Sequence, residues 1–239
     1  MEFDPGRRRV LKWMGGLVAA PALSMLNIQT AYAEQAVNCP IYMLHGENGT
    51  VLEGIIKANI GRVSVSVEQL GEMIRGERKV SDKPLFCLTF DDGLAIQYEQ
   101  AKPVLDKYGL EATFYIMGGL MDDSWKGDNV HRYMSSEQIR HLSRLGYQIG
   151  SHTVTHRSLT TLYASQDFSS IEDEIRQSKS KLEDVIEQKV NSFSYPNGSN
   201  NPAIVELVSG VYTTAVSTIS GSIQNESGIY LLRRNRPQN

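Results

Sequence analysis

Short apolar runs alternate with stretches of helical periodicity along most of the chain. The runs are rich in apolar and β-branched residues, as is typical of buried strands, and they lie at 39–45, 85–90, 112–117, 147–149, 192–195, 212–218 and 230–233. The helical stretches lie between them, at 63–75, 98–107, 135–145 and 202–208, with a longer one that begins near 169. Strands that alternate with helices favour an α/β fold built on a parallel sheet.

Two of the helix starts carry the spacing of a capping box. Ser135 is followed by Gln138, and Ser169 by Glu172, so each pair offers a side-chain acceptor and a reciprocal partner for the first turn. The charged residues of the longer helix lie opposite its apolar positions, which predicts a solvated face. Residues 121–129 are mostly polar, with one aromatic residue among them, which predicts a loop over one open end of the fold.

Residues 1–33 indicate an export signal. An arginine triplet at 7–9 precedes an apolar pair and a lysine, close to the twin-arginine pattern, and 31–33 has the A-x-A form of a cleavage site. The apolar stretch between them is short and broken by glycine and proline, so it does not predict a membrane span. We expect a cleaved twin-arginine-type signal peptide, a single domain over 34–239, export to the periplasm or beyond, and no stable membrane anchor. A disordered basic tail is the alternative.

Composition narrows the classes of partner. The formal net charge is −3, and a nucleic-acid-binding protein would need a basic stripe that the sequence does not carry. The cysteines are Cys39 and Cys87. An oxidising compartment would permit a disulfide between them, whereas the place of Cys87 inside an apolar run favours two buried thiols.

The run at 85–90 ends in two adjacent carboxylates, Asp91 and Asp92, followed by Gly93. Adjacent carboxylates repel each other, and each loses hydration energy on burial unless a cation or hydrogen-bond donors compensate. The glycine permits a sharp turn that lets both side chains face one cleft. Asp-Asp-Gly is also common in ordinary turns, so this motif alone does not define a site.

Two histidines, His152 and His156, follow the short run at 147–149. One carboxylate and two imidazoles suit a borderline divalent metal and leave positions open for water and substrate. A histidine pair on a solvated loop is the alternative, because the β-branched Thr-Val-Thr between the rings does not assure a helix that would align them. The metal hypothesis therefore depends on the two motifs together. His131 and His141 are interpreted as surface residues.

The motifs resemble those of a known family. TFDDG at 89–93, SHTVTH at 151–156 and FSYPNG at 193–198 are similar to motifs of the carbohydrate-esterase polysaccharide deacetylases, also called the NodB-homology family. The resemblance extends from about residue 40 to about residue 234. It implies an incomplete, distorted (β/α) barrel with its ligands at the carboxyl ends of the strands. It also implies metal-dependent removal of acetyl groups from a polysaccharide, with N-acetyl groups favoured over O-acetyl groups.

The resemblance assigns roles to particular residues. The ligands of one divalent ion, zinc or alternatively nickel or cobalt, would be Asp92, His152 and His156. Asp91 would act as general base toward a metal-activated water. The backbone N–H of Asn197 would stabilise the oxyanion, and Tyr195 in the same motif is a candidate for the oxyanion or substrate site.

Two features depart from the family pattern. The third motif usually carries an arginine that orients the base, and Ser194 stands at that position, while Asn197 replaces a tyrosine. The usual last histidine motif, which supplies a general acid, is not found before Asn239. The chain looks closer to the branch of exopolysaccharide N-acetylglucosamine deacetylases, some of which also lack that arginine and start with an apolar strand that ends in a histidine.

The departing nitrogen of an acetamide needs a positioned acid. His45 ends the apolar run at 39–45, and in a parallel barrel the carboxyl end of a strand opens on the cleft that would hold Asp91 and Asp92, so His45 is the candidate general acid. A strand-end histidine that only caps a loop is the alternative. Two other functions stay open: a weakened, carbohydrate-binding homologue that kept the metal, and a different metal hydrolase such as a phosphoesterase. Nothing in the sequence indicates which sugar or linkage is cleaved or the oligomeric state.

Overall fold

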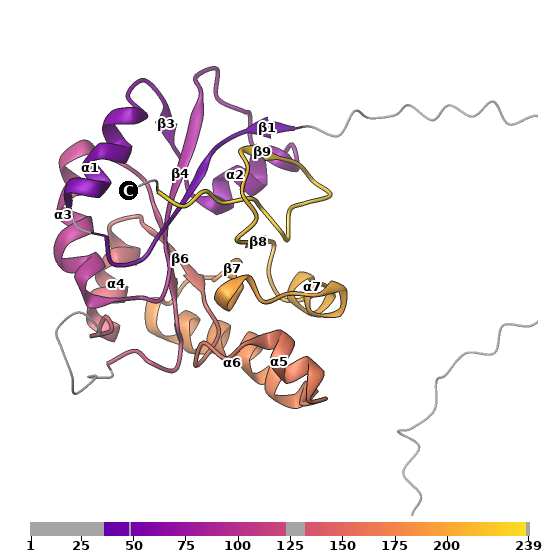
Figure 1. Cartoon of the computed structure of the whole chain (residues 1–239). Helices are drawn as coiled ribbons and strands as arrows, with labels where there is room; N and C mark the ends of the chain where they lie inside the picture. The colour runs from indigo at the N-terminus through magenta and orange to yellow at the C-terminus, as the bar shows by residue number, and fades with distance from the viewer. Residues whose placement is uncertain (1–35, 48, 123–131, 238–239) are drawn as a thin grey trace, which may run out of the picture. The chain divides into compact units, whose positions relative to one another are not determined.

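A seven-stranded parallel sheet forms the centre of the molecule and curls into an incomplete barrel (Figure 1). Its main strands follow one another in chain order: β2 (Ile41–Leu44), β4 (Leu85–Phe90), β5 (Thr113–Ile116), β6 (Gln148–Ser151), β7 (Ser192–Ser194) and β8 (Thr214–Val216). A short strand, β3 (Val63–Ser64), pairs with the first residues of β4. The predicted (β/α) barrel is confirmed.

This computed structural model describes residues 36–47, 49–122 and 132–237, all of them within one unit, Ala33–Asn239. The predicted signal peptide, His131 and most of the predicted loop at 121–129 lie outside the described residues.

Helices connect successive strands, and several of them cover the outer face of the sheet. They are α1 (Gly49–Ala58), a π-helical turn η1 (Gln97–Ala101) that continues into α3 (Lys102–Tyr108), α4 (Ser136–Arg144), α5 (Leu159–Ala164), α6 (Phe168–Ile186) and α7 (Pro202–Ser209). Figure 1 shows α1, α3 and α4 following one another along one side of the sheet. In the part of the chain that the structure describes, no helix combines the length and apolarity needed to cross a membrane.

One helix, α2 (Val67–Ile74), lies under the amino-terminal ends of the strands. The Val67 N–H donates to Thr113 Oγ1 at the start of β5, and the Glu68 N–H donates to Gln148 at the start of β6. A Cβ added at Gly71 would lie 2.4 Å from Thr214 at the start of β8, so only glycine lets the helix approach that closely. The amino-terminal end of the barrel is thus closed, and its carboxyl end is left for a site.

The structure corrects three sequence expectations. The cap of α6 is Asp167, whose side chain accepts the Ser170 N–H, and not the predicted Ser169. The helix α1 (Gly49–Ala58) is not among the helical stretches that the sequence predicts. The predicted strand at 230–233 is irregular and takes part in the sheet through a single bridge at Leu232.

That last segment nevertheless fills the gap in the barrel. Leu232 forms a parallel bridge with Val216 of β8, and Asn235 forms one with Tyr42 of β2. Residues 232–235 therefore lie between the last and the first strands of the barrel. Arg234, between the two bridges, is 1% exposed.

The two cysteines meet inside the barrel as free thiols. Cys39 and Cys87 are fully buried, and their Sγ atoms lie 3.6 Å apart. Burial raises the pKa of the Cys87 thiol, because the thiolate would lose its hydration.

We expect the native protein to show no reactive thiol toward a water-soluble disulfide reagent at pH 8, because reagent and thiolate cannot meet in the closed barrel. Two thiols per chain should react after unfolding in guanidinium, and one in Cys87→Ala. Absorbance of the released reagent anion measures the count. Unfolded protein that still shows no thiol would indicate a disulfide instead.

Candidate active site

The register of the parallel strands places polar residues from several strands at one level. Leu44 pairs with Phe90, so the next residues, His45 and Asp91, follow β2 and β4 at the same height. Ser151 pairs with Phe193, so His152 lies level with Ser194. The carboxyl ends of parallel strands share one edge, and the motifs separated in sequence therefore converge there.

A left-handed turn after β4 lets neighbouring aspartates share a cleft. Successive side chains of a strand point to opposite faces, but Asp92 has φ 73° and Gly93 has φ 68°, which turn the chain sharply. A Cβ at Gly93 would lie 3.1 Å from the Ile116 side chain, so the position suits glycine in both conformation and space. Asp91 consequently points into the barrel, while Asp92 faces the histidines.

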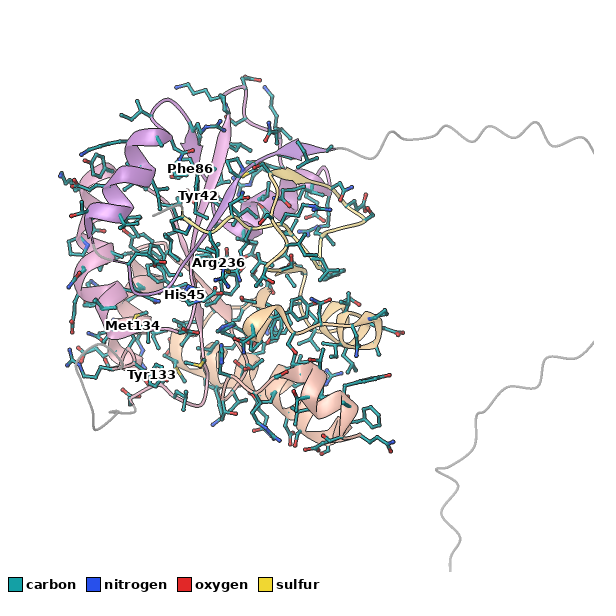
Figure 2. All side chains as sticks on the ribbon, in the orientation of Figure 1. Tyr42, His45, Phe86, Tyr133, Met134 and Arg236 are labelled. Carbon is teal, nitrogen blue, oxygen red and sulfur yellow. The ribbon has the colours of Figure 1, made fainter. Side chains whose placement is uncertain are left out.

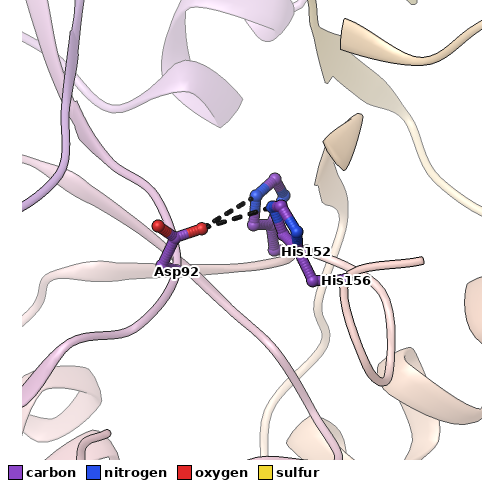
Figure 3. A group of neighbouring side chains, drawn as sticks. All are labelled: Asp92, His152 and His156. Carbon is purple, nitrogen blue, oxygen red and sulfur yellow. Dashed lines mark ion pairs between the residues drawn. The ribbon is translucent and has the colours of Figure 1, made fainter. Parts of the chain in front are cut away.

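Asp92, His152 and His156 form a cluster with the donor set of a metal site (Figure 3). Asp92 Oδ1 lies 3.4 Å from His152 Nε2 and 3.5 Å from His156 Nε2, and the three ligand atoms lie within 4.8 Å of one another. Ligand atoms about 2.0–2.2 Å from one tetrahedral zinc ion are themselves about 3.3–3.6 Å apart. Asp92 Oδ1 is also buried without a hydrogen-bond partner among the described residues. The cluster therefore fits a divalent ion.

The charges of the cluster act on one another. Burial alone would raise the pKa of Asp92, but the neighbouring imidazoles outweigh it and lower that pKa. Burial alone would lower the pKa of His152, but Asp92 and Asp91 outweigh it and raise that pKa. For His156, burial and the charge of His152 lower the pKa. Ionised carboxylate and neutral imidazole are the forms that bind metals.

The two histidines are held in different ways. His152 is 2% exposed, and its Nδ1 lies 2.8 Å from the Ser194 carbonyl oxygen, which fixes the ring and turns Nε2 toward Asp92. The side chain of His156 is 32% exposed, and its backbone N–H donates to Thr153 Oγ1 at 3.0 Å. The cluster is thus closed on the side of His152 and open to solvent on the side of His156.

Asp91 is clamped by a buried arginine from the end of the chain. Arg234 Nη1 donates to Asp91 Oδ1 at 2.7 Å and Nη2 to Oδ2 at 2.8 Å, with Ser194 Oγ also donating to Oδ2 at 3.2 Å. Asp91 is 3% exposed. Burial by itself would raise the pKa of Asp91, but the guanidinium outweighs it and holds that pKa well below its usual range.

Arg234 is a site residue that the sequence motifs do not indicate. Ser194 stands where the family has an arginine, and the structure places the Arg234 guanidinium beside that serine, with Nη2 3.1 Å from Ser194 Oγ. An arginine from the irregular segment at 232–235 therefore stands where the family's usual arginine would lie. The only available signal was an arginine next to the apolar run at 230–233, which does not by itself distinguish a buried residue from a surface one.

His45 lies close enough to the aspartates to influence them. Its charge contributes to lowering the pKa values of Asp91 and Asp92. The buried Gln97, in the π-helical turn, donates from Nε2 to the carbonyl oxygens of both His45 and Asp91, and so ties the ends of β2 and β4 together. His45 and Arg236 line one small pocket, together with Met43, Glu47 and Pro237 (Figure 2).

The third motif follows β7 at the same edge. Asn197 is exposed, with φ 55°, inside a short 3₁₀ turn, η3 (Pro196–Gly198). Tyr195 is 1% exposed and packs edge-on against Phe193, and its hydroxyl has no hydrogen-bond partner among the described residues. Outside this group, His141 is exposed on α4 beside Tyr98, in agreement with its interpretation as a surface residue.

Comparison with known proteins gives one family. The sequence profile described as "Polysaccharide deacetylase" matches residues 78–215, more than half of the chain. The "Putative polysaccharide deacetylase YxkH" of Bacillus subtilis (strain 168) is 29% identical over 177 residues, which cover 74% of this chain and 59% of that protein. The chain thus spans less than two thirds of the length of this relative.

Solved structures share the fold. The Streptococcus pyogenes deacetylase PplD, in complex with acetate, superposes with a TM-score of 0.70 at 21% identity, over 85% of this chain and 92% of that one. IcaB from Ammonifex degensii superposes with a TM-score of 0.70 at 19% identity, over 83% of this chain and 91% of that one. At identities of 21% and 19%, these similarities show a shared fold alone.

Arg234→Met is expected to lower the free energy of unfolding by about 3–5 kcal/mol at pH 7, because it leaves Asp91 buried without a counter-charge. The unpaired carboxyl would take up a proton as the pH falls, so the loss should shrink between pH 7 and pH 5. In the wild-type protein the pKa of Asp91 is depressed. The ion pair therefore makes its full contribution to the free energy of unfolding above about pH 4, and this contribution is lost as the pH falls below that value. Urea unfolding at both pH values, with metal removed by a chelator, measures the difference.

Arg236→Met is the matched control, since Arg236 lies two residues away and is exposed. It should change the free energy of unfolding by less than about 0.5 kcal/mol. An equal loss at pH 7 and pH 5 for Arg234→Met would contradict the electrostatic explanation and leave only lost packing.

Proposed function

The chain belongs to the polysaccharide deacetylase family, and we propose that it hydrolyses acetyl groups, N-acetyl in preference to O-acetyl, on a polysaccharide. The observation that carries the proposal is the metal-fitting cluster of Asp92, His152 and His156 beside the clamped Asp91. An acetylated polysaccharide or oligosaccharide is the proposed substrate. Export to the periplasm is proposed as well, from the twin-arginine-like residues at 7–12.

One divalent ion is the proposed cofactor, and its ligands would be Asp92, His152 and His156. Zinc suits one carboxylate and two imidazoles best, with nickel or cobalt as alternatives. When bound, such an ion polarises a carbonyl group and lowers the pKa of water toward about 7. The exposed side of His156 is where an acetyl group would enter.

Asp91 is the proposed general base. Arg234 holds both carboxylate oxygens in one orientation and lowers the pKa of Asp91, so the base is ionised at neutral pH. Each carboxylate oxygen has two lone pairs, and Oδ1 accepts from Arg234 with one of them, which leaves the other for the proton of the attacking water. The contact with Arg234 lowers the proton affinity of Asp91, but it fixes the direction from which the carboxylate meets the attacking water.

His45 is the proposed general acid. The departing nitrogen of an N-acetyl group must be protonated, because an amide anion is a poor leaving group. His45 follows β2 at the height of Asp91, and its charge lowers the pKa values of Asp91 and Asp92, which supports a place for the ring near both carboxylates. This placement favours N-acetyl over O-acetyl substrates, whose oxygen leaves more easily.

The backbone N–H of Asn197 is the proposed oxyanion donor. The left-handed conformation of Asn197 turns the chain at the end of β7, next to Ser194, which itself contacts both Asp91 and Arg234. Tyr195 is proposed to contact the substrate through its backbone, because its side chain is buried.

Zinc binding and turnover should separate the two aspartates. Asp92→Ala, His152→Ala and His156→Ala are expected to lose bound zinc, because each removes one of three protein ligands. Asp91→Asn should keep the zinc and the fold but lose about 10²- to 10⁴-fold in turnover, because an amide cannot accept the proton. Elemental analysis and acetate release from acetylated glucosamine oligomers measure the two properties. Full zinc content in all three ligand variants would refute the site, and normal turnover of Asp91→Asn would refute its role.

The His45 role predicts a substrate-dependent effect. His45→Ala should leave zinc content unchanged and slow acetate release from N-acetylated oligomers by about 10²-fold or more, because a positioned acid is missing. Activated aryl acetates, whose leaving group needs no proton, should be affected much less. Equal losses on the two substrates would mean that His45 binds substrate or supports the structure.

A further inference from the structure

A buried carboxylate lies behind the loop that carries both histidines. Glu174, on α6, is 5% exposed. Its Oε2 accepts the backbone N–H groups of Val154 at 2.8 Å and of Thr155 at 2.9 Å, and its Oε1 accepts the Thr155 hydroxyl. Among the described residues no cation pairs with Glu174, so its charge is compensated by this loop.

The loop has a conformation that it would not adopt unaided. Thr153 has φ 67° and His156 has φ 62°, and a left-handed conformation costs a non-glycine residue roughly 1–2 kcal/mol. The loop is held from the other side as well, since the N–H groups of Gly118 and Gly119 donate to the carbonyl oxygens of Thr153 and Val154. Glu174 supplies the acceptors on the helix side.

The two histidine rings depend on this loop to different degrees. His152 is fixed by the Ser194 carbonyl oxygen and by its burial. The His156 ring forms no hydrogen bond with the protein within the described ranges other than its ionic contact with Asp92. The direction of His156 Nε2 is therefore set by the backbone between Thr153 and His156.

We propose that Glu174 is a positioning residue of the metal site, acting through His156. By holding the backbone at Val154 and Thr155 it fixes the third ligand 3.5 Å from Asp92 Oδ1. The inference rests on the metal site of the proposed function. Partners behind metal ligands contribute substantially to affinity, because they remove the freedom that a ligand would lose on binding.

The test is zinc affinity, measured by competition with a chromogenic chelator. Glu174→Gln has nearly the same shape, and its amide oxygen can still accept the two N–H groups, but the charge is lost, the hydrogen bonds become weaker neutral ones, and the NH₂ cannot accept the Thr155 hydroxyl; we expect zinc to bind about 10-fold more weakly. Glu172→Gln, on the same helix with its side chain 55% exposed, is the matched control and should bind as the wild type does. The visible spectrum of bound cobalt should change in Glu174→Gln and not in Glu172→Gln, because the geometry of the ligands has changed.

A double variant shows whether the effect passes through His156. His156→Ala, which loses its zinc on purification, should keep only a weak affinity that is measured by titration with excess zinc, and Glu174→Gln should lower that residual affinity little further, since the ligand that it positions is gone. If Glu174→Gln does not fold, Thr155→Val, which removes one donor to the carboxylate, should give a smaller loss of affinity in a folded protein. Unchanged zinc affinity in whichever of these variants is folded would overturn the inference alone. Failure of the wild-type protein to bind zinc would overturn the metal site, and this inference with it.

Discussion

A carboxylate stays ionised inside a barrel only where a counter-charge is built beside it, and Arg234 provides that charge for Asp91. The pair joins β4 to the irregular segment that fills the gap between β8 and β2. The same contact therefore closes the barrel and prepares the proposed base. Thr89, Ser194 and the Ser217 carbonyl oxygen accept or share the remaining hydrogen bonds of the guanidinium, so the pair is embedded in a satisfied polar layer.

Above this layer the strand ends act as rigid supports and the turns carry strain. Asp92, Thr153, His156 and Asn197 all have left-handed backbones without being glycine. Such conformations are unfavourable and persist only where surrounding contacts determine them. Here the supports are neighbouring loops and a buried carboxylate on α6. The left-handed backbones at Asp92, Thr153 and His156 thus help to bring the side chains of Asp92, His152 and His156 together into one cluster.

The sequence predicted the parts of this arrangement that depend on local pattern. The apolar run before Asp91, the capping box at Ser135 and the spacing of the two histidines each have a short-range physical cause, and the structure has β4, α4 and the histidine loop where these patterns indicate. Arg234 could not be predicted in the same way, because its partner lies 143 residues earlier and the contact depends on closure of the whole sheet. The cap of α6 was misplaced because Asp167 and Ser169 are both good capping residues, and the preceding turn decides between them.

Arg234 follows all the strands of the sheet in sequence, which has a consequence for biosynthesis. A ribosome delivers β2 to β8 before residues 232–235, so the nascent sheet passes through a stage in which Asp91 faces an open gap. Closure of the barrel therefore requires residues 232–235, and a polypeptide interrupted before residue 234 would carry both histidines and both aspartates without the contact that orients Asp91.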